Sequence, residues 1–404
     1  MARPTNSDGE ALSVDVTARA LTIRDWLLSE ARFLEDPDRA TEGFAQRLID
    51  AGLPLDRMAS AMPTLHASRR GLGRIWNRDT GVEALDFPWG NQAIYEASPY
   101  YQAHRTGQWV TFRLDEIGDE AYSIVADLRE DGYRDYVCMP IFFRDGAEGG
   151  MTFATRQSGG FSDQDLAILR SVEPAIGIVL DLARTWRLLQ ETLRMYVGDD
   201  PHARILSGQV RRGEVLHIRS AVLFADMRGF TALSAKMDAE ETVTLLNRYF
   251  DCVVPPIEQR GGQVLKYMGD GVLAIHRGGE SDAAACIAAL NSANDVIARI
   301  EDRCAREHEG PRFGIKIALH FGEVAYGNIG SGARLDYTVV GRDVNIASRL
   351  ADLAGHLDRQ LVLSSDFAAM LPGYRFDSLG QHALRGVPEP QLVFEPATEN
   401  ASLL

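Results

Sequence analysis

The chain has 404 residues, of which 45% are hydrophobic and 25% charged, and its formal net charge is −15. This length exceeds one ordinary hydrophobic core, so we expect two or three domains. The acidic balance argues against a nucleic-acid partner, which needs clustered lysine and arginine, although a phosphate ligand needs only a few local cations. The cysteines are widely separated, which indicates reduced thiols rather than a disulfide framework or a zinc site: Cys138, Cys252, Cys286 and Cys304.

The opening residues and the most apolar helical run both bear on location. The N-terminal stretch MARPTNSDGEALSVD lacks the apolar segment of a secretory signal. The run AIGIVLDLA, residues 175–183, is too short to span a bilayer and contains Asp181. We therefore expect no membrane span and a cytoplasmic location.

Residues 1–160 predict a small α+β domain. Helical spacing of apolar residues around ALTIRDWLLSEARFL and GFAQRLIDAGL comes first. Strand-like runs follow: HASRRGLGRIW, GQWVTFRL, DYVCMPIFF and GGMTFAT. The last two runs are joined by the turn RDGAEG, which predicts a hairpin near the end of this domain.

Residues 161–214 predict a helical linker followed by a hinge. Ser162 or Asp163 can cap the helix start. Apolar residues then recur at the 4-3-4-3 spacing of a coiled-coil seam: Leu182, Trp186, Leu189, Leu193 and Tyr196. The helix either packs on its own domain or pairs with the same helix of a second chain. We favour the second alternative because the seam runs past the predicted end of the first domain. The polar stretch 198–214 predicts the hinge.

Residues 215–395 alternate between strands and helices. A strand, HIRSAVLFAD, precedes an amphipathic helix over DAEETVTLLNRYFDCVVPPIEQR, which we expect its prolines and Gly261-Gly262 to stop. A hairpin, VLKYMGDGVLAIH, and a long helix capped near Ser281 follow, and then two further β segments and the helix DVNIASRLADLA. The order β-α-β-β-α-β-β-α predicts an α+β, ferredoxin-like antiparallel sheet with helices on one face.

Two carboxylates in this region are candidates for cation binding. Asp226 follows the apolar run AVLFA, so it lies at the end of a buried strand, where an unpaired charge is costly. Asp270 occupies a tight bend between Gly269 and Gly271. If the two strands are neighbours, these carboxylates converge and can hold two Mg²⁺ ions about 3.5–4 Å apart. Each aspartate alone could equally be a cap or turn residue.

Two further segments carry polar residues suited to phosphate chemistry. After Asp226, the residues MRGFT predict a tight turn and a helix start, whose free N–H groups can hold phosphate oxygens. In LDYTVVGRDVNIASRL, Asn345 and Arg349 lie four residues apart on one helix face. A guanidinium suits the spread charge of a pentavalent phosphate, and an amide can hold a ribose oxygen. Taken alone, Arg349 would be interpreted as a surface ion pair.

The segments FADMRGFT, GGQVLKYMGDGVLAIH and LDYTVVGRDVNIASRL, in this order and spacing, resemble the catalytic domain of class III nucleotidyl cyclases. The resemblance covers roughly residues 205–395. It implies that Asp226 and Asp270 bind a pair of Mg²⁺ or Mn²⁺ ions. It also implies that Asn345 orients the ribose and that Arg349 stabilises the transition state, with Phe230 and Thr231 near the phosphates.

The same resemblance assigns base recognition to Lys266 and Thr338. In this family a lysine at the first position is associated with adenine and a glutamate with guanine. An ammonium group can only donate and adenine N1 can only accept, so Lys266 favours ATP over GTP. Near the C-terminus, SLGQHALRGVPEP resembles the strand where some members carry a triphosphate-binding lysine. Ala383 falls at that position, and Arg385 is the nearby candidate to replace it.

The implied reaction converts ATP to 3′,5′-cyclic AMP and pyrophosphate. Family members work as head-to-tail pairs, so the resemblance implies a homodimer. Asp226 and Asp270 would come from one chain, with Lys266, Thr338, Asn345 and Arg349 from the other. Guanylate cyclase is the alternative among enzymes, and a non-catalytic sensing or dimerisation module is the alternative outside them.

The end of the first region resembles the second half of a GAF domain, in DYVCMPIFFRDGAEGGMTFATRQSGGFSDQDLAILRSVEPAIG. A PAS-like sensor is the alternative. This resemblance implies a regulatory domain with an unknown small-molecule or protein ligand. The Asn-Lys…Phe-Asp-Glu pattern of cyclic-nucleotide-binding members is absent from the sequence.

Overall fold

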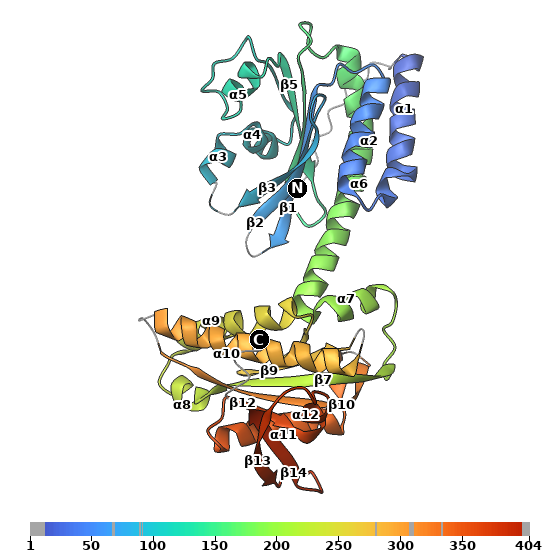
Figure 1. Ribbon diagram of the computed structural model, residues 1–404. Coiled ribbons are helices and arrows are strands. Elements are labelled where there is room, and N and C mark those ends of the chain that lie inside the picture. The colour runs from blue at the N-terminus through green and yellow to red at the C-terminus, as the bar shows by residue number, and fades with distance from the viewer. Residues whose placement is uncertain are drawn as a thin grey trace. The chain divides into compact units, whose positions relative to one another are not determined.

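The computed structural model describes residues 13–66, 69–88, 90, 92–278, 281–306, 311–332 and 334–397 (Figure 1). The chain divides into two compact units, Met1–Thr192 and Leu193–Leu404. This division lies inside helix α6 (Asp163–Val197), within the segment predicted to be a linker. The predicted domain limits at 160 and 215 stay predictions. The opening stretch examined for a secretory signal lies mostly outside the described residues.

The first unit contains a six-stranded sheet in the order β3-β2-β1-β6-β5-β4, and all neighbouring strands are antiparallel. Its strands are β1 (Arg57–His66), β2 (Arg69–Asn77), β3 (Gly81–Pro88), β4 (Val110–Arg113), β5 (Asp135–Phe142) and β6 (Glu148–Thr155). The sequence predicted β4, β5, β6 and most of β2, although residues 67–68 of that run lie outside the described part. It did not predict β1, which contains Pro63, or the mostly exposed β3.

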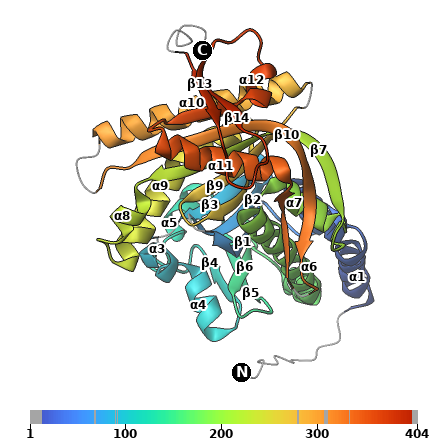
Figure 2. The same cartoon turned by 90° about the horizontal axis from the view of Figure 1, so that it is seen from below.

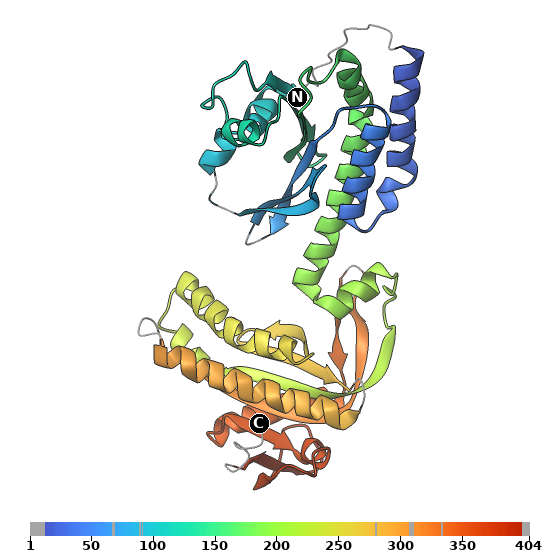
Figure 3. The ribbon, with the colours of Figure 1, turned by 45° about the horizontal axis from the view of Figure 1, so that its top comes forward.

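Helices cover both faces of this sheet (Figure 3). On one face lie α1 (Val14–Ser29), the short helix η1 (Ala31–Phe33), α2 (Pro37–Asp50) and α6. On the other lie α3 (Gln92–Glu96), α4 (Pro99–Thr106) and α5 (Val125–Glu130). Strand β5 explains this arrangement, because Val137 and Met139 pack among α1, α2 and α6, whereas Tyr136 and Cys138 pack toward α4 and α5.

Helix α6 is a single helix of 35 residues, as the sequence predicted. Ser162 caps its start, since its Oγ accepts from the Asp165 N–H at 3.3 Å and the Asp165 carboxylate accepts in return from the Ser162 N–H at 2.8 Å. The first turns are buried in the unit, but the predicted seam is not. Four of its side chains are exposed to solvent: Leu182 50%, Trp186 50%, Leu189 44% and Tyr196 81%.

The second unit contains a sheet in the order β13-β14-β12-β10-β7-β9-β8, with β11 paired to β10. Its strands are β7 (Val215–Arg228), β8 (Gln263–Met268), β9 (Gly271–Arg277), β10 (Gly314–Gly330), β11 (Leu335–Val340), β12 (Leu361–Ser364), β13 (Phe376–His382) and β14 (Gln391–Pro396). The sequence predicted an antiparallel sheet, and this is wrong for one pair, because β12 pairs with β10 in parallel. A helical crossover between the two strands permits that direction.

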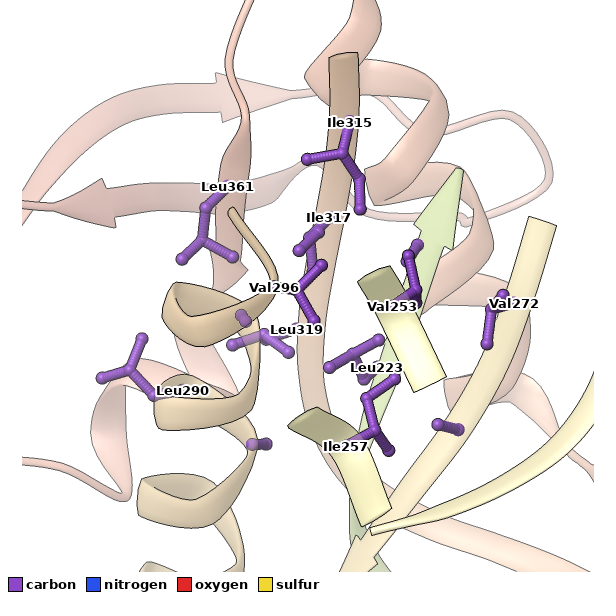
Figure 4. Packing of buried hydrophobic residues seen from close by; sticks show 14 of the residues in the cluster. Leu223, Val253, Ile257, Val272, Leu290, Val296, Ile315, Ile317, Leu319 and Leu361 are labelled. Atoms are coloured by element: carbon purple, nitrogen blue, oxygen red, sulfur yellow. The ribbon is translucent and has the colours of Figure 1, made fainter. Parts of the chain in front are cut away.

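The helices of this unit lie on both faces of the sheet, so the prediction of helices on one face is wrong (Figures 1 and 2). They are α7 (Asp199–Leu206), α8 (Phe230–Ser234), α9 (Ala239–Gln259), α10 (Asp282–Arg306), α11 (Arg342–His356) and α12 (Ser365–Ala369). Leu223 of β7 packs with Val253 and Ile257 of α9 (Figure 4). Val222 packs on the opposite face with Ala347 of α11. Strand β7 is apolar toward both faces and therefore needs cover on both.

Two local predictions also need correction. Helix α9 continues through Pro255 and Pro256 to Gln259, and the chain turns only at Gly261, with φ of +74°. The buried face of α9, which includes Pro256 and Ile257, holds the last turns despite the missing N–H donors. In the stretch predicted as a hinge, residues 199–206 form helix α7.

Two absences expected from the sequence can be compared with the structure. All four cysteines are free thiols, as predicted. Along the described part of the chain, no helix combines the length and the apolar character needed to cross a bilayer.

Candidate active site

The two predicted metal-binding carboxylates meet at one end of the second sheet. Asp226 lies near the end of β7, and Asp270 lies in the turn between β8 and β9. Strand β9 pairs with β7 so that Val272 lies opposite Ala225, which brings the turn beside Asp226. The two carboxyl groups are close enough to share a hydrogen bond. Gly269, with φ of +66°, makes the turn possible.

The charge of this carboxylate pair is only partly neutralised by the protein. Burial first, and then the hydrogen bond and charge of Asp226, raise the pKa of Asp270 to about 6 against the attraction of Lys316. The Nζ atom of Lys316 lies 2.8 Å from an Asp226 oxygen. Two adjacent acids therefore share one lysine, which leaves the pair able to accept positive charge.

Sequence reasoning missed two neighbours of this pair. Lys316 lies on β10 directly opposite Asp226, and its signal was a single lysine between Ile315 and Ile317 in an apolar strand. Tyr249 of α9 is fully buried, and its hydroxyl has no hydrogen-bond partner among the described residues. Burial raises the pKa of Tyr249 well above its usual value, with the Asp226 and Asp270 charges as further causes. No sequence signal separates Tyr249 from an ordinary core residue.

The two carboxylates fit a hard divalent cation whose remaining ligands come from water and a substrate. Within the described ranges, no cluster of three or more histidine, cysteine, aspartate or glutamate side chains could form a cage for a metal ion. Mg²⁺ usually keeps several waters and binds through one or two carboxylates together with substrate phosphates. Asp226 and Asp270 supply such a pair of carboxylates, and the ion pair that they form within the described residues is that of Lys316 with Asp226.

A second group of predicted residues gathers around β8 and β11. The Nζ atom of Lys266 on β8 forms an ion pair with Asp336 on β11. Thr338 lies two residues after Asp336, so both side chains lie on the same face of β11. The structure therefore brings Lys266 close to the strand that carries Thr338. Sequence reasoning missed Asp336, although it belongs to the LDYT segment of the third motif.

The remaining predicted residues lie on helices and in one loop. Asn345 is exposed on α11. One turn later, the Nη1 atom of Arg349 lies 3.2 Å from the Oδ2 atom of Asp352. Phe230 and Thr231 begin α8, directly after the end of β7 and Gly229. Arg385 is exposed in the connection between β13 and β14.

The contacts do not join these residues into one site within a chain. Among the described residues, no hydrogen bond or ion pair connects Asp226 or Asp270 with the second group, namely Lys266, Thr338, Asn345 and Arg349. The hairpin carrying Arg385 lies at the sheet edge opposite β8. Its two strands lie five and six strand spacings from β8, and at about 4.8 Å for each spacing this is roughly 24–29 Å across the sheet.

Residues 217–395 match the family described as the adenylate and guanylate cyclase catalytic domain. The adenylate cyclase of Anabaena cylindrica is 35% identical over 140 residues, which cover 33% of this chain and 27% of that protein. An uncharacterized protein of Mycobacterium tuberculosis is 37% identical over 187 residues, covering 46% of this chain and 34% of that protein. The chain thus spans about a third of the length of these curated relatives.

Two solved structures are similar to part of this chain. The adenylyl cyclase CyaB from P. aeruginosa is 26% identical with a TM-score of 0.41, covering 46% of this chain and 96% of that chain. The guanylyl cyclase Cya2 is 28% identical with a TM-score of 0.41, covering 45% and 93%. The family match confirms the predicted family and fold class of the second unit, whereas the GAF-like assignment of the first unit stays a prediction. Residues 217–395 belong to the catalytic domains of the class III adenylate and guanylate cyclases.

Proposed function

We propose that the chain is an adenylate cyclase that converts ATP to 3′,5′-cyclic AMP and pyrophosphate. The observation that carries this proposal is the meeting of Asp226 and Asp270, distant in sequence, at one end of the sheet, where Lys316 alone among the described residues forms an ion pair with them. A carboxylate pair of this kind suits two divalent cations, Mg²⁺ or Mn²⁺, at each site. An adenylate cyclase among the similar proteins supports the choice of substrate.

In this proposal each residue of the carboxylate end has a defined task. The bound metal ions would lower the pKa of the ribose 3′-hydroxyl and neutralise the triphosphate. Asp226 and Asp270 would hold the cations, and the backbone at Phe230 and Thr231, which begin α8 shortly after Asp226 in the chain, would orient phosphate oxygens. Lys316, with Nζ 2.8 Å from an Asp226 oxygen, offsets part of the negative charge of the pair before cations bind.

The second group of residues recognises the nucleoside. Lys266 donates to adenine N1 and Thr338 accepts from the adenine amino group, which gives the preference for ATP. Asn345 orients the ribose, and Arg349 stabilises the charge that develops on the transferred phosphate. Before substrate binds, Asp336 holds the Lys266 ammonium through their ion pair. The alternative is a guanylate cyclase, with GTP as its substrate.

We further propose that a complete site needs two chains in a head-to-tail homodimer. Among the described residues, no hydrogen bond or ion pair joins the two aspartates to the residues proposed to bind the nucleoside. Arg385 lies at the edge of the sheet opposite β8. The exposed seam of α6 offers a second surface for pairing, with Leu182 and Trp186 each 50% exposed. Two equivalent sites would follow from the symmetry of such a dimer.

The reaction can be tested with the purified chain. ATP or GTP is incubated with Mg²⁺ or Mn²⁺, and the cyclic products are separated and quantified. We expect cyclic AMP to dominate and the Asp270→Asn variant to form almost none. Dominant cyclic GMP would favour the guanylate cyclase alternative. No cyclic product with either nucleotide and either metal would contradict catalysis and leave a non-catalytic sensing or dimerisation module.

The shared site is tested by mixing two inactive variants. Asp270→Ala removes a carboxylate, and Arg349→Ala removes the guanidinium from the other group. In a mixed dimer, one of the two sites keeps both the carboxylate and the guanidinium. At equal mixing half of the dimers are mixed, and each has one of its two sites intact. We therefore expect activity to return toward a quarter of the wild-type value. Persistent inactivity of a mixture that demonstrably contains mixed dimers would contradict the shared site.

We also propose that the first unit regulates the second. The GAF-like resemblance implies a ligand-binding or partner-binding role, and α6 passes from one unit into the other as a continuous helix. A ligand of the first unit would then alter the rate of cyclisation through α6. Equal activity with and without every ligand shown to bind the first unit would contradict this role.

A further inference from the structure

The first unit contains a cavity of about 420 Å³. Strands β1 and β3, helices α3 and α4, and the turn between β5 and β6 contribute to its walls. Much of the lining is apolar or aromatic: Met62, Pro63, Phe87, Ile94, Tyr95 and Tyr100. Small-molecule sites in proteins usually measure about 300–1,000 Å³ and have such linings with a few fixed polar groups. The cavity therefore has the size and surface of a ligand site.

His104 is the best-fixed polar group in this wall. One ring nitrogen, Nε2, lies 2.7 Å from the Gly149 carbonyl oxygen and must donate to it. The other, Nδ1, shares a hydrogen bond of 2.9 Å with the Tyr95 hydroxyl. These partners fix the orientation of the imidazole, whose side chain is only 6% exposed. His104 therefore shapes this wall of the cavity.

Glu148 gives the cavity its charge. It is the only described lining residue with a carboxylate or a cationic side chain other than histidine. Its carboxylate is 45% exposed and lies 3.7 Å from His104 Nδ1, which already shares a hydrogen bond with Tyr95. The nearby carboxylate of Asp145 is bound by Arg184 at 2.9 Å and is thereby neutralised. The rim of an apolar cavity thus carries one carboxylate that no lysine or arginine among the described lining residues faces.

Arg184 also fastens two sides of the cavity. From α6 it donates to the Pro63 carbonyl at 3.0 Å and to Asp145 at 2.9 Å. Pro63 belongs to the β1 wall, and Asp145 precedes the wall residues Gly146 and Ala147. Because the Arg184 side chain is only 6% exposed, these bonds are shielded from water. The cavity is therefore held in shape before any ligand arrives.

We propose that this cavity binds a small arylalkylamine, with its planar ring against Phe87, Tyr100 and Met62 and the ammonium group of its side chain at Glu148. A flat ring matches the aromatic lining, and a cation matches the single carboxylate. An anion of the same shape would be repelled. This inference does not depend on the proposed catalysis, because it concerns residues of the first unit alone.

The test uses three indoles of similar shape and different charge. Tryptamine, tryptophol and indole-3-propanoate are titrated into the full-length chain by calorimetry at pH 7.5, without nucleotide or metal. We expect tryptamine to bind about five- to tenfold more tightly than tryptophol, as for a partly exposed charge pair, and indole-3-propanoate to bind most weakly. The absence of binding by all three, or tightest binding by the propanoate, would overturn the proposal.

Three variants locate the binding site. In Glu148→Gln, the advantage of tryptamine over tryptophol should disappear while tryptophol binding stays the same. In Ala61→Phe, which fills the cavity, all three ligands should bind at least tenfold more weakly, with thermal unfolding measured to verify folding. Asp270→Asn, in the other unit, should leave all affinities unchanged. Wild-type tryptamine affinity in Glu148→Gln would overturn the placement of the amine. Because binding is measured without turnover, an inactive cyclase would not affect the result.

Discussion

Two half-buried aspartates of the second unit, Asp200 and Asp270, show how differently one fold can treat the same side chain. Asp200 on α7 accepts hydrogen bonds from Tyr326 at 2.6 Å, from Arg204 at 2.8 Å and from Arg277 at 2.9 Å. Burial raises its pKa, but these three donors outweigh burial and hold the pKa below its usual value. Asp270 has another acid as its neighbour, and burial together with that acid raises its pKa to about 6.

The comparison separates a structural carboxylate from one suited to binding a cation. Asp200 is satisfied within its own chain, and it ties α7 to β9 and β10. Asp270 shares a single lysine with Asp226, so its ionised form needs positive charge from outside. The number of donors around each carboxylate, rather than its burial, therefore predicts its role.

The largest expected effect separates these two aspartates in catalysis. Asp270→Asn should lower the rate of cyclic AMP formation by about a thousandfold, since cation binding supplies several kcal/mol of transition-state stabilisation. Asp200→Asn, the matched control, should stay within about threefold of wild type because Asp200 contacts no proposed substrate group. Initial rates at saturating Mn²⁺ and ATP measure both. Equal losses in the two variants would contradict the distinction.

Asp336 is a third case, a carboxylate paired one-to-one with Lys266. Replacing Lys266 by glutamate removes the donor to adenine, a charged hydrogen bond worth about 1.5–3 kcal/mol. The ratio of kcat/KM for ATP to that for GTP should therefore fall by about 10- to 100-fold. Asp336→Asn is added in the same chain to remove repulsion between the two acids, and Lys266→Met serves as the uncharged control. An unchanged ratio would remove Lys266 from base recognition.

The structural role of Asp200 predicts a loss of stability that depends on pH. Asp200→Asn should lower the free energy of unfolding by about 1–3 kcal/mol at pH 7, because charged hydrogen bonds to two arginines are lost. The folded-state pKa of Asp200 lies below the unfolded value of 3.8. Its stabilisation is thus present above pH 3.8 and is lost as pH falls through the folded pKa. Thermal unfolding at pH 7 and pH 3 measures the difference, and a constant difference would contradict this role.

Asp270 should show the opposite dependence, with a smaller effect. Its folded-state pKa of about 6 lies above the unfolded value of 3.8, so its contribution to stability is full below pH 3.8 and is lost as pH rises through about 6. In metal-free protein at pH 8, Asp270→Asn should therefore stabilise the second unit, by on the order of 1 kcal/mol after allowing for solvent screening. Chemical unfolding in a chelator measures this, and destabilisation would contradict it.

The sequence predicted the carboxylate pair because the relevant signals are local. Asp226 ends an apolar strand, and Asp270 lies between two glycines at a hairpin bend, so both positions follow from short-range patterns. Lys316 and Asp336 were missed because their roles depend on register across the sheet. Lys316 is 90 positions after Asp226, and Asp336 is 70 positions after Lys266. No local pattern sets such pairings.

Other errors came from tertiary contacts that override local rules. Pro255 and Pro256 suggested a helix end, but packing of α9 on the sheet keeps the helix intact. Helix α11 was assigned to the wrong face because the alternation of β7 does not identify which helix covers which side.

The most direct test of the carboxylate pair is Mn²⁺ binding to the full-length chain without nucleotide, followed by electron paramagnetic resonance at pH 5 and pH 7.5. Since a proton and the cation compete for Asp270, whose pKa is about 6, wild-type affinity should fall roughly tenfold at pH 5. Asp200→Asn should bind Mn²⁺ as wild type does. Asp270→Asn should bind weakly at both pH values. Wild-type Mn²⁺ affinity in Asp270→Asn at pH 7.5 would contradict the assignment of this pair as the cation site.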